Sequence, residues 1–179
     1  MTHEEPTFIR KTLRYRGPAF SVYEYETQIG GRIVKRDIIE RKHGVVIVPV
    51  DTEHNVLLIR EFCAGSNSFI LSLPGGSIEG DEPSADAMRE LREETGYRAA
   101  RLIKLRFSYS HPSTSNRKSY VFLGYDLIFD PLVSEDEIIQ PVRLPLDEAI
   151  ATAYRDFESD GGTVGTLLMA RDKIREMGL

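Results

Sequence analysis

The sequence predicts an α/β protein, α+β in the broader sense, with a mixed sheet between helices and a β-rich arm at its N-terminus. Two observations lead to this fold class. Runs of β-branched and aromatic residues both precede and follow a helical segment at residues 83–95. A second long amphipathic segment closes the chain at residues 163–177. Strands on both sides of one helix, with another helix at the end, suit a mixed sheet between helices.

The first forty residues form an extended and charged segment. Residues 20–27 and 32–39 are rich in β-formers, and Gly30 and Gly31 between them predict a hairpin turn. This hairpin has little apolar surface of its own, so we expect it to pack on the main domain or on a second subunit. The predicted domains are therefore an arm at residues 1–40 and a main domain at residues 41–179.

The main domain alternates predicted strands and helices. A continuous apolar run at residues 45–50 predicts a buried strand, and residues 74–82 predict a glycine-rich loop. The following helix is expected to begin at Pro83 and to end at Gly96. Its predicted buried stripe consists of Ala85, Met88, Leu91 and Thr95. The other predicted elements are strands at residues 56–62, 69–73, 101–109, 119–127 and 138–144 and helices at residues 145–154 and 163–177.

Composition limits the class of protein and its partners. With 179 residues, 41% of them apolar, the chain fits one ordinary domain with an added arm. The net charge of −5 argues against nucleic acid as the main partner, but it leaves an anionic small substrate open, because bound metals invert the local field. The single cysteine, Cys63, fits a reducing compartment. The sequence has no signal-peptide core and no apolar run of the ~20 residues that a membrane span needs, so we expect a soluble cytoplasmic protein.

Three carboxylates gather on one side of the helix predicted at residues 83–95. Glu90 and Glu94 are at i and i+4, and Glu90 and Glu93 are at i and i+3. Like charges so placed repel unless cations lie between them, and a hard divalent cation such as Mg²⁺ or Mn²⁺ suits that need. Arg89 precedes Glu93 by one helical turn and is expected to neutralise and orient its carboxylate. The alternative is a solvated acidic helix with internal ion pairs.

The stretch at residues 75–97, GGSIEGDEPSADAMRELREETGY, resembles the Nudix box. That pattern is Gly, five residues, Glu, seven residues, then Arg-Glu-apolar-x-Glu-Glu-x-Gly-apolar. The second half matches at every fixed position. Counted from Gly76 the loop is one residue short, and counted from Gly75 the spacing holds but Asp81 replaces the Glu. We therefore expect Asp81 or Glu82 to do the structural work of that Glu.

The resemblance implies an α/β/α sandwich of the Nudix type and a pyrophosphohydrolase that depends on Mg²⁺ or Mn²⁺. Glu90 and Glu94 are then the primary metal ligands, and the carbonyl of Gly75 is a backbone ligand. Glu93 is a further ligand or orients the attacking water, and Arg89 supports it.

The wider chain resembles the ADP-ribose pyrophosphatase branch of this family. The similarity includes the arm, the Arg60-Glu61-Phe62 run and a late acidic loop that precedes Ile138-Ile139. The branch cleaves nucleoside diphosphate sugars to a nucleoside monophosphate and a sugar phosphate, and its members are homodimers whose arms help to form the base pocket. The loop that ends at Asp81-Glu82-Pro83 is similar to that of GDP-mannose hydrolases. Cys63, where many ADP-ribose enzymes have a second Arg, argues against strict ADP-ribose specificity.

The resemblance also implies a general base on the late acidic loop. Glu137 is the preferred candidate. Glu135 is the other candidate and is otherwise expected to contact the substrate. The alternative is that both residues belong to a solvated acidic loop.

Four residues outside the helix are candidates for substrate binding. Arg41 and Arg60 are expected to bind phosphate or ribose through bidentate hydrogen bonds, with ordinary ion pairs as the alternative. Phe20 and Tyr23 are candidates to stack on a base from the arm, and packing in the core or inside the hairpin is the preferred interpretation of both. Two other functions stay open: a hydrolase of dinucleoside polyphosphates or RNA 5′ ends, and a non-catalytic nucleotide-sensing module. The complete set of helix carboxylates argues against the second.

Overall fold

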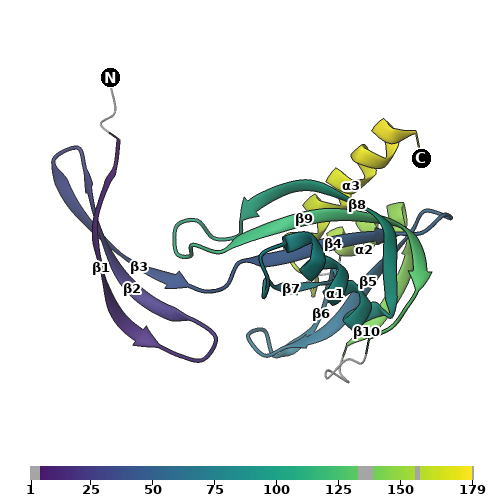
Figure 1. The fold of residues 1–179 in the computed structure, drawn as a ribbon, viewed down its shortest axis with the longest axis horizontal. Helices are drawn as coiled ribbons and strands as arrows, with labels where there is room; N and C mark the ends of the chain where they lie inside the picture. Colours follow the sequence, from purple (N-terminus) through teal and green to yellow (C-terminus); the bar gives the residue numbers. More distant parts are fainter. Residues whose placement is uncertain (1–4, 133–138, 156–157, 179) are drawn as a thin grey trace. The chain divides into compact units, whose positions relative to one another are not determined.

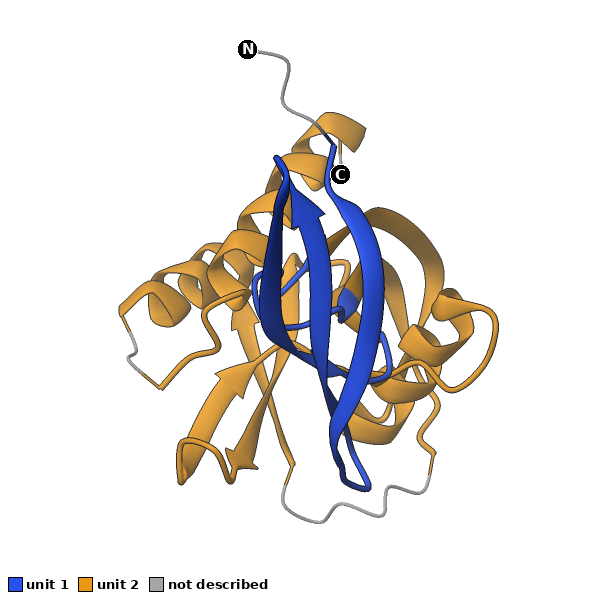
Figure 2. Cartoon of the chain, turned by 90° about the vertical axis from the view of Figure 1, so that its left-hand side faces the viewer, with its two compact units in different colours: residues 1–43, 109–118 blue, residues 44–108, 119–179 orange. Residues whose placement is uncertain are grey.

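The computed structural model describes residues 5–132, 139–155 and 158–178, and Figure 1 shows its elements. The strands are β1 (Thr7–Arg16), β2 (Ser21–Ile29), β3 (Arg32–Glu40), β4 (Gly44–Val50), β5 (Asn55–Cys63), β6 (Ser68–Ser72), β7 (Gly75–Ser77), β8 (Tyr97–Tyr109), β9 (Lys118–Phe129) and β10 (Gln140–Pro145). The helices are α1 (Pro83–Thr95), α2 (Leu146–Arg155) and α3 (Thr163–Met177). The chain divides into two compact units, residues 1–43 with 109–118 and residues 44–108 with 119–179 (Figure 2).

The larger unit is built on a mixed sheet with the strand order β10-β5-β4-β9-β8. β4 runs parallel to β9 and antiparallel to β5, while β6 pairs with β5 and β7 pairs with β4. The sequence of β4, GVVIVPV, is almost wholly buried. A continuous apolar strand of this kind is typical of a position in the middle of a sheet that is covered on both faces.

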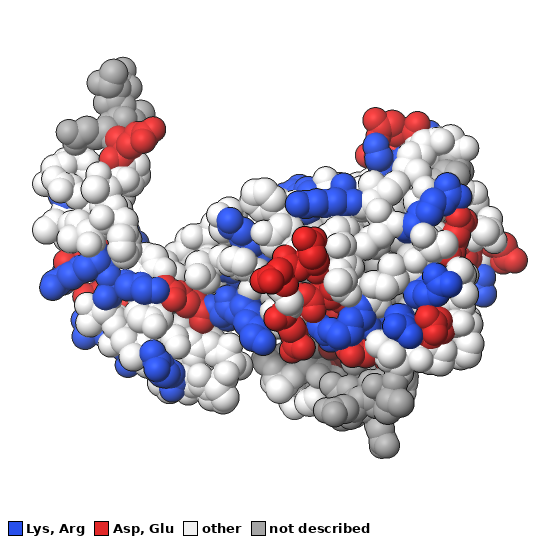
Figure 3. Space-filling view, in the orientation of Figure 1, with Lys and Arg blue, Asp and Glu red and all other residues white. Residues whose placement is uncertain are grey.

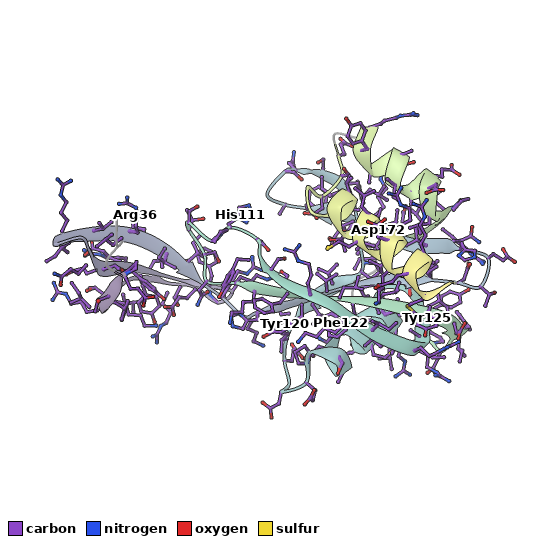
Figure 4. All side chains as sticks on the ribbon, turned by 90° about the horizontal axis from the view of Figure 1, so that it is seen from above. Arg36, His111, Tyr120, Phe122, Tyr125 and Asp172 are labelled. Carbon is purple, nitrogen blue, oxygen red and sulfur yellow. The ribbon has the colours of Figure 1, made fainter. Side chains whose placement is uncertain are left out.

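Helices cover both faces of this sheet. Val45 and Ile47 of β4 pack with Leu91 of α1 in one apolar cluster. Val48, of opposite parity on β4 to Ile47, packs with Leu167 of α3 in the second cluster, which also includes α2. Figure 4 shows α1 and α3 on opposite sides of the strands. This α/β/α arrangement with a mixed sheet confirms the predicted fold class.

Three local predictions need correction. Residues 75–77, expected in a loop, form β7 because they pair with Gly44–Val46 of β4. β8 begins at Tyr97, directly after α1, and not at residue 101. In α1, Ala85 is exposed and Met88 only partly buried, whereas Asp86 and Ala87 are buried. The helix therefore turns a slightly different side to the sheet than the predicted stripe.

The smaller unit contains an antiparallel sheet in the order β1-β2-β3. Gly30 and Gly31 join β2 to β3 with φ angles of 53° and 77°, which suit a tight hairpin turn. Among the described residues of these three strands, no apolar side chain is buried, and the buried residue is Glu26. The sheet has thus no apolar core of its own, in line with its charged sequence.

Residues 109–118, between β8 and β9, belong to this smaller unit. The Ile39 N–H donates to the Thr114 carbonyl at 2.8 Å, and the Asn116 N–H donates to the Ile39 carbonyl at 3.3 Å. These bonds connect the end of β3 to a loop that is remote in sequence. Of the helices in the described ranges, none combines the length and the apolar character that crossing a membrane requires.

Candidate active site

The direction in which α1 points its carboxylates is set by the residues that end the helix and by those that it buries. Glu82 is the N-cap residue, Pro83 occupies the first turn, and Gly96 ends the helix at φ 78° with its N–H donating to the Arg92 carbonyl. Leu91 and Thr95 are buried against the sheet. Because these residues fix the rotation of the helix, Glu90, Glu93 and Glu94 lie together on a partly buried side of it.

The glycines of β7 let the backbone approach two of these carboxylates. The N–H of Gly75 donates to Oε2 of Glu94 at 2.9 Å. A Cβ on Gly76 would lie 2.1 Å from Oε1 of Glu90, so the Glu90 carboxylate occupies the space that a side chain would need. A Cβ on Gly75 would lie 2.3 Å from the carbonyl oxygen of Val45. Two adjacent glycines are therefore required here for different reasons, one for the sheet and one for the carboxylate.

Arg89 connects the acidic side chains of α1. Its guanidinium donates to Glu93 at 2.7 Å, to Glu90 at 2.8 Å and to Asp86 at 3.2 Å. It also reaches the carbonyl of Ser77 in β7 at 3.3 Å. Burial lowers the pKa of Arg89, but the hydrogen bonds and charges of these carboxylates outweigh it and raise the pKa above its ordinary value. The guanidinium thus stays charged and holds two of the three predicted metal ligands.

The charge of Arg89 does not fully compensate the charges of the carboxylates around it. Burial raises the pKa of Glu94 to about 8; the Gly75 N–H opposes this, and the charges of Glu90, Glu61 and Glu93 add to it. Burial likewise raises the pKa of Glu90, against the lowering effect of Arg89. Figure 3 shows acidic side chains gathered where α1 lies, with basic side chains beside them. Burial and mutual repulsion both disfavour the negative charge on these carboxylates. A hard divalent cation, which binds oxygen ligands, would relieve both effects.

Each of the three carboxylates is engaged in a hydrogen bond in this structure. Within the described ranges, no three His, Cys, Asp or Glu side chains converge into a ready-made metal cluster. Arg89 engages Glu90 and Glu93, and the backbone of Gly75 engages Glu94. The oxygen donors therefore fit a divalent cation by their chemistry.

Sequence reasoning missed two acidic residues, one within α1 and one in β5. Asp86 is 6% exposed and accepts hydrogen bonds from the N–H groups of Glu79 and Gly80, each at 3.2 Å. Asp81 and Glu82, the expected replacements for the loop Glu, are exposed, and Glu82 makes no side-chain cap. The expectation that one of them supports the loop is thus wrong. A signal was present: an Asp stands inside a predicted helix, one turn before Arg89.

Glu61 of β5 is the second residue that was missed. It accepts a hydrogen bond from the hydroxyl of Ser72 at 3.3 Å, and its charge raises the pKa of Glu94. In the sequence, Glu61 stands out only as the middle residue of the Arg60-Glu61-Phe62 run. Nothing in local periodicity indicates that β5 brings this carboxylate into the electrostatic neighbourhood of α1.

The other predicted site residues that the structure describes belong to elements other than α1 and β7. Arg60 is exposed on β5, 3.8 Å from a carboxylate oxygen of Glu158, with its guanidinium 6.0 Å from the ring centre of Phe69. Arg41 and Phe20 belong to the smaller unit, where both are exposed and Phe20 lies 5.7 Å from the ring of Tyr15. The candidate bases fall outside the described residues; these are Glu135 and Glu137.

Comparisons with known proteins agree with this geometry. A family model described as NUDIX domain matches residues 40–162. The chain is 28% identical over 152 residues to an ADP-ribose pyrophosphatase of Bacillus subtilis (strain 168), which covers 82% of each chain. It is 29% identical over 147 residues to a GDP-mannose pyrophosphatase of Yersinia pestis (strain Pestoides F), which covers 76% of this chain and 74% of the relative. A crystal structure of an ADP compounds hydrolase matches it with a TM-score of 0.88 at 25% identity, over 99% of this chain and 98% of that one. The chain belongs to the Nudix family and is a hydrolase of phosphorus-containing anhydrides.

Proposed function

We propose that the protein hydrolyses the pyrophosphate bond of nucleoside diphosphate sugars, of the ADP-ribose or the GDP-mannose type. The products are a nucleoside monophosphate and a sugar phosphate. The observation that carries this proposal is the placement of Glu90 and Glu94 against the Gly75–Gly76 backbone in a chain of this family. The names of two relatives, an ADP-ribose pyrophosphatase and a GDP-mannose pyrophosphatase, support the substrate class.

The metal site in this proposal is built from α1 and β7. Glu90 and Glu94 would be the primary ligands of Mg²⁺ or Mn²⁺, and the carbonyl of Gly75 would be a backbone ligand. Glu93 would be a further ligand or would orient the attacking water. When bound, such ions supply neutralisation of the diphosphate and activation of a water. Arg89 donates to Glu90 and Glu93 and would hold both carboxylates in position for these ions.

A proton acceptor for the attacking water has to come from elsewhere, because the carboxylates of α1 are engaged as ligands. We assign this role to Glu137, with Glu135 as the second candidate and as a substrate contact otherwise. An acidic side chain on a loop can approach the water after the substrate binds. The water oxygen then forms a bond to one phosphorus atom, and the bond from that phosphorus to the bridging oxygen breaks.

The substrate is recognised by basic and aromatic side chains. Arg60 is exposed on β5. The next residue of this strand, Glu61, is close enough for its charge to raise the pKa of Glu94. Arg41 is the second predicted phosphate or ribose contact. Burial and the charge of Arg41 both lower the pKa of Arg117, so two guanidinium groups lie near each other in the smaller unit. Such a pair favours an anion beside it. Phe20, exposed on the arm, is the proposed stacking partner of the base.

The assembly that we propose is a homodimer in the cytoplasm. Residues 1–40 act as an arm for dimerisation and for the base pocket, and residues 41–179 form the hydrolase domain. The support for this role is that the described apolar side chains of β1–β3 are all at least partly exposed, Phe8 and Ile33 by 54% and 62%. Surface of this kind is typical of an interface with another chain.

The test is a hydrolysis screen with ADP-ribose, GDP-mannose, ADP-glucose, UDP-glucose and diadenosine polyphosphates, each with and without Mg²⁺. Chromatography of the products identifies the bond that is cleaved, and ¹⁸O-labelled water identifies the phosphorus that is attacked. We expect a nucleoside monophosphate and a sugar phosphate from at least one nucleotide sugar. Turnover of dinucleoside polyphosphates or RNA 5′ ends alone would contradict the proposal.

A further inference from the structure

Asp86 lies at the centre of a hydrogen-bond network between the glycine-rich loop and the candidate metal ligands. One carboxylate oxygen, Oδ2, accepts hydrogen bonds from the backbone N–H groups of Glu79 and Gly80, each at 3.2 Å. The other oxygen, Oδ1, accepts a hydrogen bond from Nη2 of Arg89 at 3.2 Å. Asp86 is 6% exposed, so water competes little for these positions. The carboxylate thus joins a loop backbone on one side to a guanidinium on the other.

The guanidinium that Asp86 holds is the same one that contacts the metal-ligand candidates. Arg89 donates to Glu90 at 2.8 Å and to Glu93 at 2.7 Å. A guanidinium is a rigid planar fork, so a contact on one of its nitrogen atoms restricts where the others can lie. Asp86, together with the Ser77 carbonyl that accepts from the same nitrogen at 3.3 Å, therefore restrains where Arg89 meets Glu90 and Glu93.

The charge state of Asp86 is compatible with this role. Burial alone would raise its pKa, but hydrogen bonds from Gly80, Arg89 and Glu79 keep the pKa below its ordinary value. Asp86 is thus a carboxylate at neutral pH. Two backbone N–H donors and one guanidinium compensate its charge, which accounts for an Asp that is buried within a helix.

We infer that Asp86 is a positioning residue for the candidate metal centre: it anchors Arg89 to the Glu79–Gly80 backbone and so orients Glu90 and Glu93. It does in this chain what Asp81 and Glu82, which are exposed, do not do. The inference rests on the proposed function insofar as Glu90 and Glu93 are metal ligands. Outer-shell partners of this kind typically contribute ~10–100-fold to metal affinity or activity.

The test compares Asp86→Asn with Asp81→Asn, which makes the same chemical change on an exposed side chain of the same loop region. The first measurement, on metal-free protein, is amide hydrogen exchange at Glu79 and Gly80 by NMR. It should become faster only in Asp86→Asn, because one uncharged amide oxygen has to replace the two carboxylate oxygens that accept from the loop and from Arg89. The second is Mn²⁺ binding by electron paramagnetic resonance, which should weaken ~10–100-fold in Asp86→Asn and stay at the wild-type value in Asp81→Asn. Both are made at a temperature where circular dichroism shows fully folded protein.

Steady-state kinetics complete the test. In Asp86→Asn the Mg²⁺ concentration for half-maximal rate should rise and excess Mg²⁺ should recover part of kcat, while the KM for the substrate changes little. A residue that only stabilised the fold would not change the Mg²⁺ dependence of the folded enzyme. Wild-type Mn²⁺ affinity and wild-type Mg²⁺ dependence in folded Asp86→Asn would overturn the inference.

A second variant covers the case in which Asp86→Asn does not fold. Asp86→Glu keeps the charge but moves the carboxylate by one methylene, so the Arg89 guanidinium must shift. The inference predicts weaker Mn²⁺ binding in this variant, and unchanged binding contradicts it. Hydrogen exchange and Mn²⁺ binding do not need the substrate. They therefore remain decisive if the wild-type enzyme turns out to hydrolyse no nucleotide sugar.

Discussion

The backbone N–H of Gly75 donates a hydrogen bond of 2.9 Å to Oε2 of Glu94, so that β7 and the last turn of α1 hold each other at the candidate metal centre. The donor comes from β7 and the acceptor from α1, near the two ends of the Nudix box at residues 75–97. This contact, together with the Gly76 backbone beside Glu90, means that a change in the glycine pair alters the carboxylates directly.

Glu94→Gln should abolish turnover and leave the fold intact. Gln keeps the volume and can still accept the Gly75 N–H, but it loses the charge that a cation requires. We expect a loss of at least ~10²-fold in kcat, the lower range for removal of a principal electrostatic group. Glu148→Gln, an exposed residue of α2, is the matched control. If Glu94→Gln kept more than half of the wild-type rate at saturating Mg²⁺, Glu94 would not be a metal ligand.

The two glycines should respond differently to Ala. In Gly76→Ala the new Cβ meets the end of the Glu90 side chain at 2.1 Å, which can rotate away, so we expect a folded protein with ~10–100-fold weaker metal binding or activity. In Gly75→Ala the Cβ meets the Val45 backbone oxygen at 2.3 Å. A backbone atom in a paired strand cannot rotate away, so we expect the free energy of unfolding to fall by ~1–3 kcal/mol.

Thermal unfolding and Mg²⁺ titrations of the rate distinguish the two cases. Gly80→Ala is the control, because the nearest atom to its Cβ is 3.9 Å away. An equal loss of stability in Gly75→Ala and Gly76→Ala, with an equal loss of activity, would contradict the division of roles.

Glu137→Gln should lower kcat by ~10²–10⁴-fold, as is typical for removal of a general base, with little change in metal affinity. Glu135→Gln is the control, because it removes the same charge from the same loop. If Glu135→Gln is the inactive variant, the base is Glu135. If both variants turn over normally, the base lies elsewhere and Glu93 becomes the leading candidate.

Deletion of residues 1–39 should give a monomer with a much higher KM. The arm has no described buried apolar side chain, so its stability must come from contacts outside its own three strands. Light scattering measures the mass and steady-state kinetics measures KM. A truncated protein that remains dimeric with unchanged KM would exclude both roles of the arm.

The arm should lose stability in acid. Hydrogen bonds from Arg10 at 2.8 Å and Lys35 at 2.9 Å hold the pKa of Glu26 at about 2, below the ordinary 4.5. Because the folded-state pKa is depressed, the stabilising contribution is complete above pH 4.5 and is lost as the pH falls toward 2. Amide exchange in β2 and β3 between pH 5 and pH 2 measures this loss. Glu26→Gln should flatten the profile, and an identical acid profile in both proteins would contradict the assignment.

The sequence by itself determined the parts of the protein that depend on local periodicity. Residues i, i+3 and i+4 of one helix are neighbours in any fold, so the common side of Glu90, Glu93 and Glu94 followed from spacing alone. The bounds of α1 followed from Pro83 and Gly96, and the apolar run of β4 indicated a strand buried on both faces.

Only the tertiary structure decided which residues support that helix. β7 exists because its backbone pairs with β4, and Glu61 acts on Glu94 because the sheet brings β5 toward α1. The role of Asp86 depends on a bend of the chain that presents the Glu79 and Gly80 N–H groups to it. Each of these relations joins segments by through-space contact, and hydrophobic periodicity carries no information about such contacts.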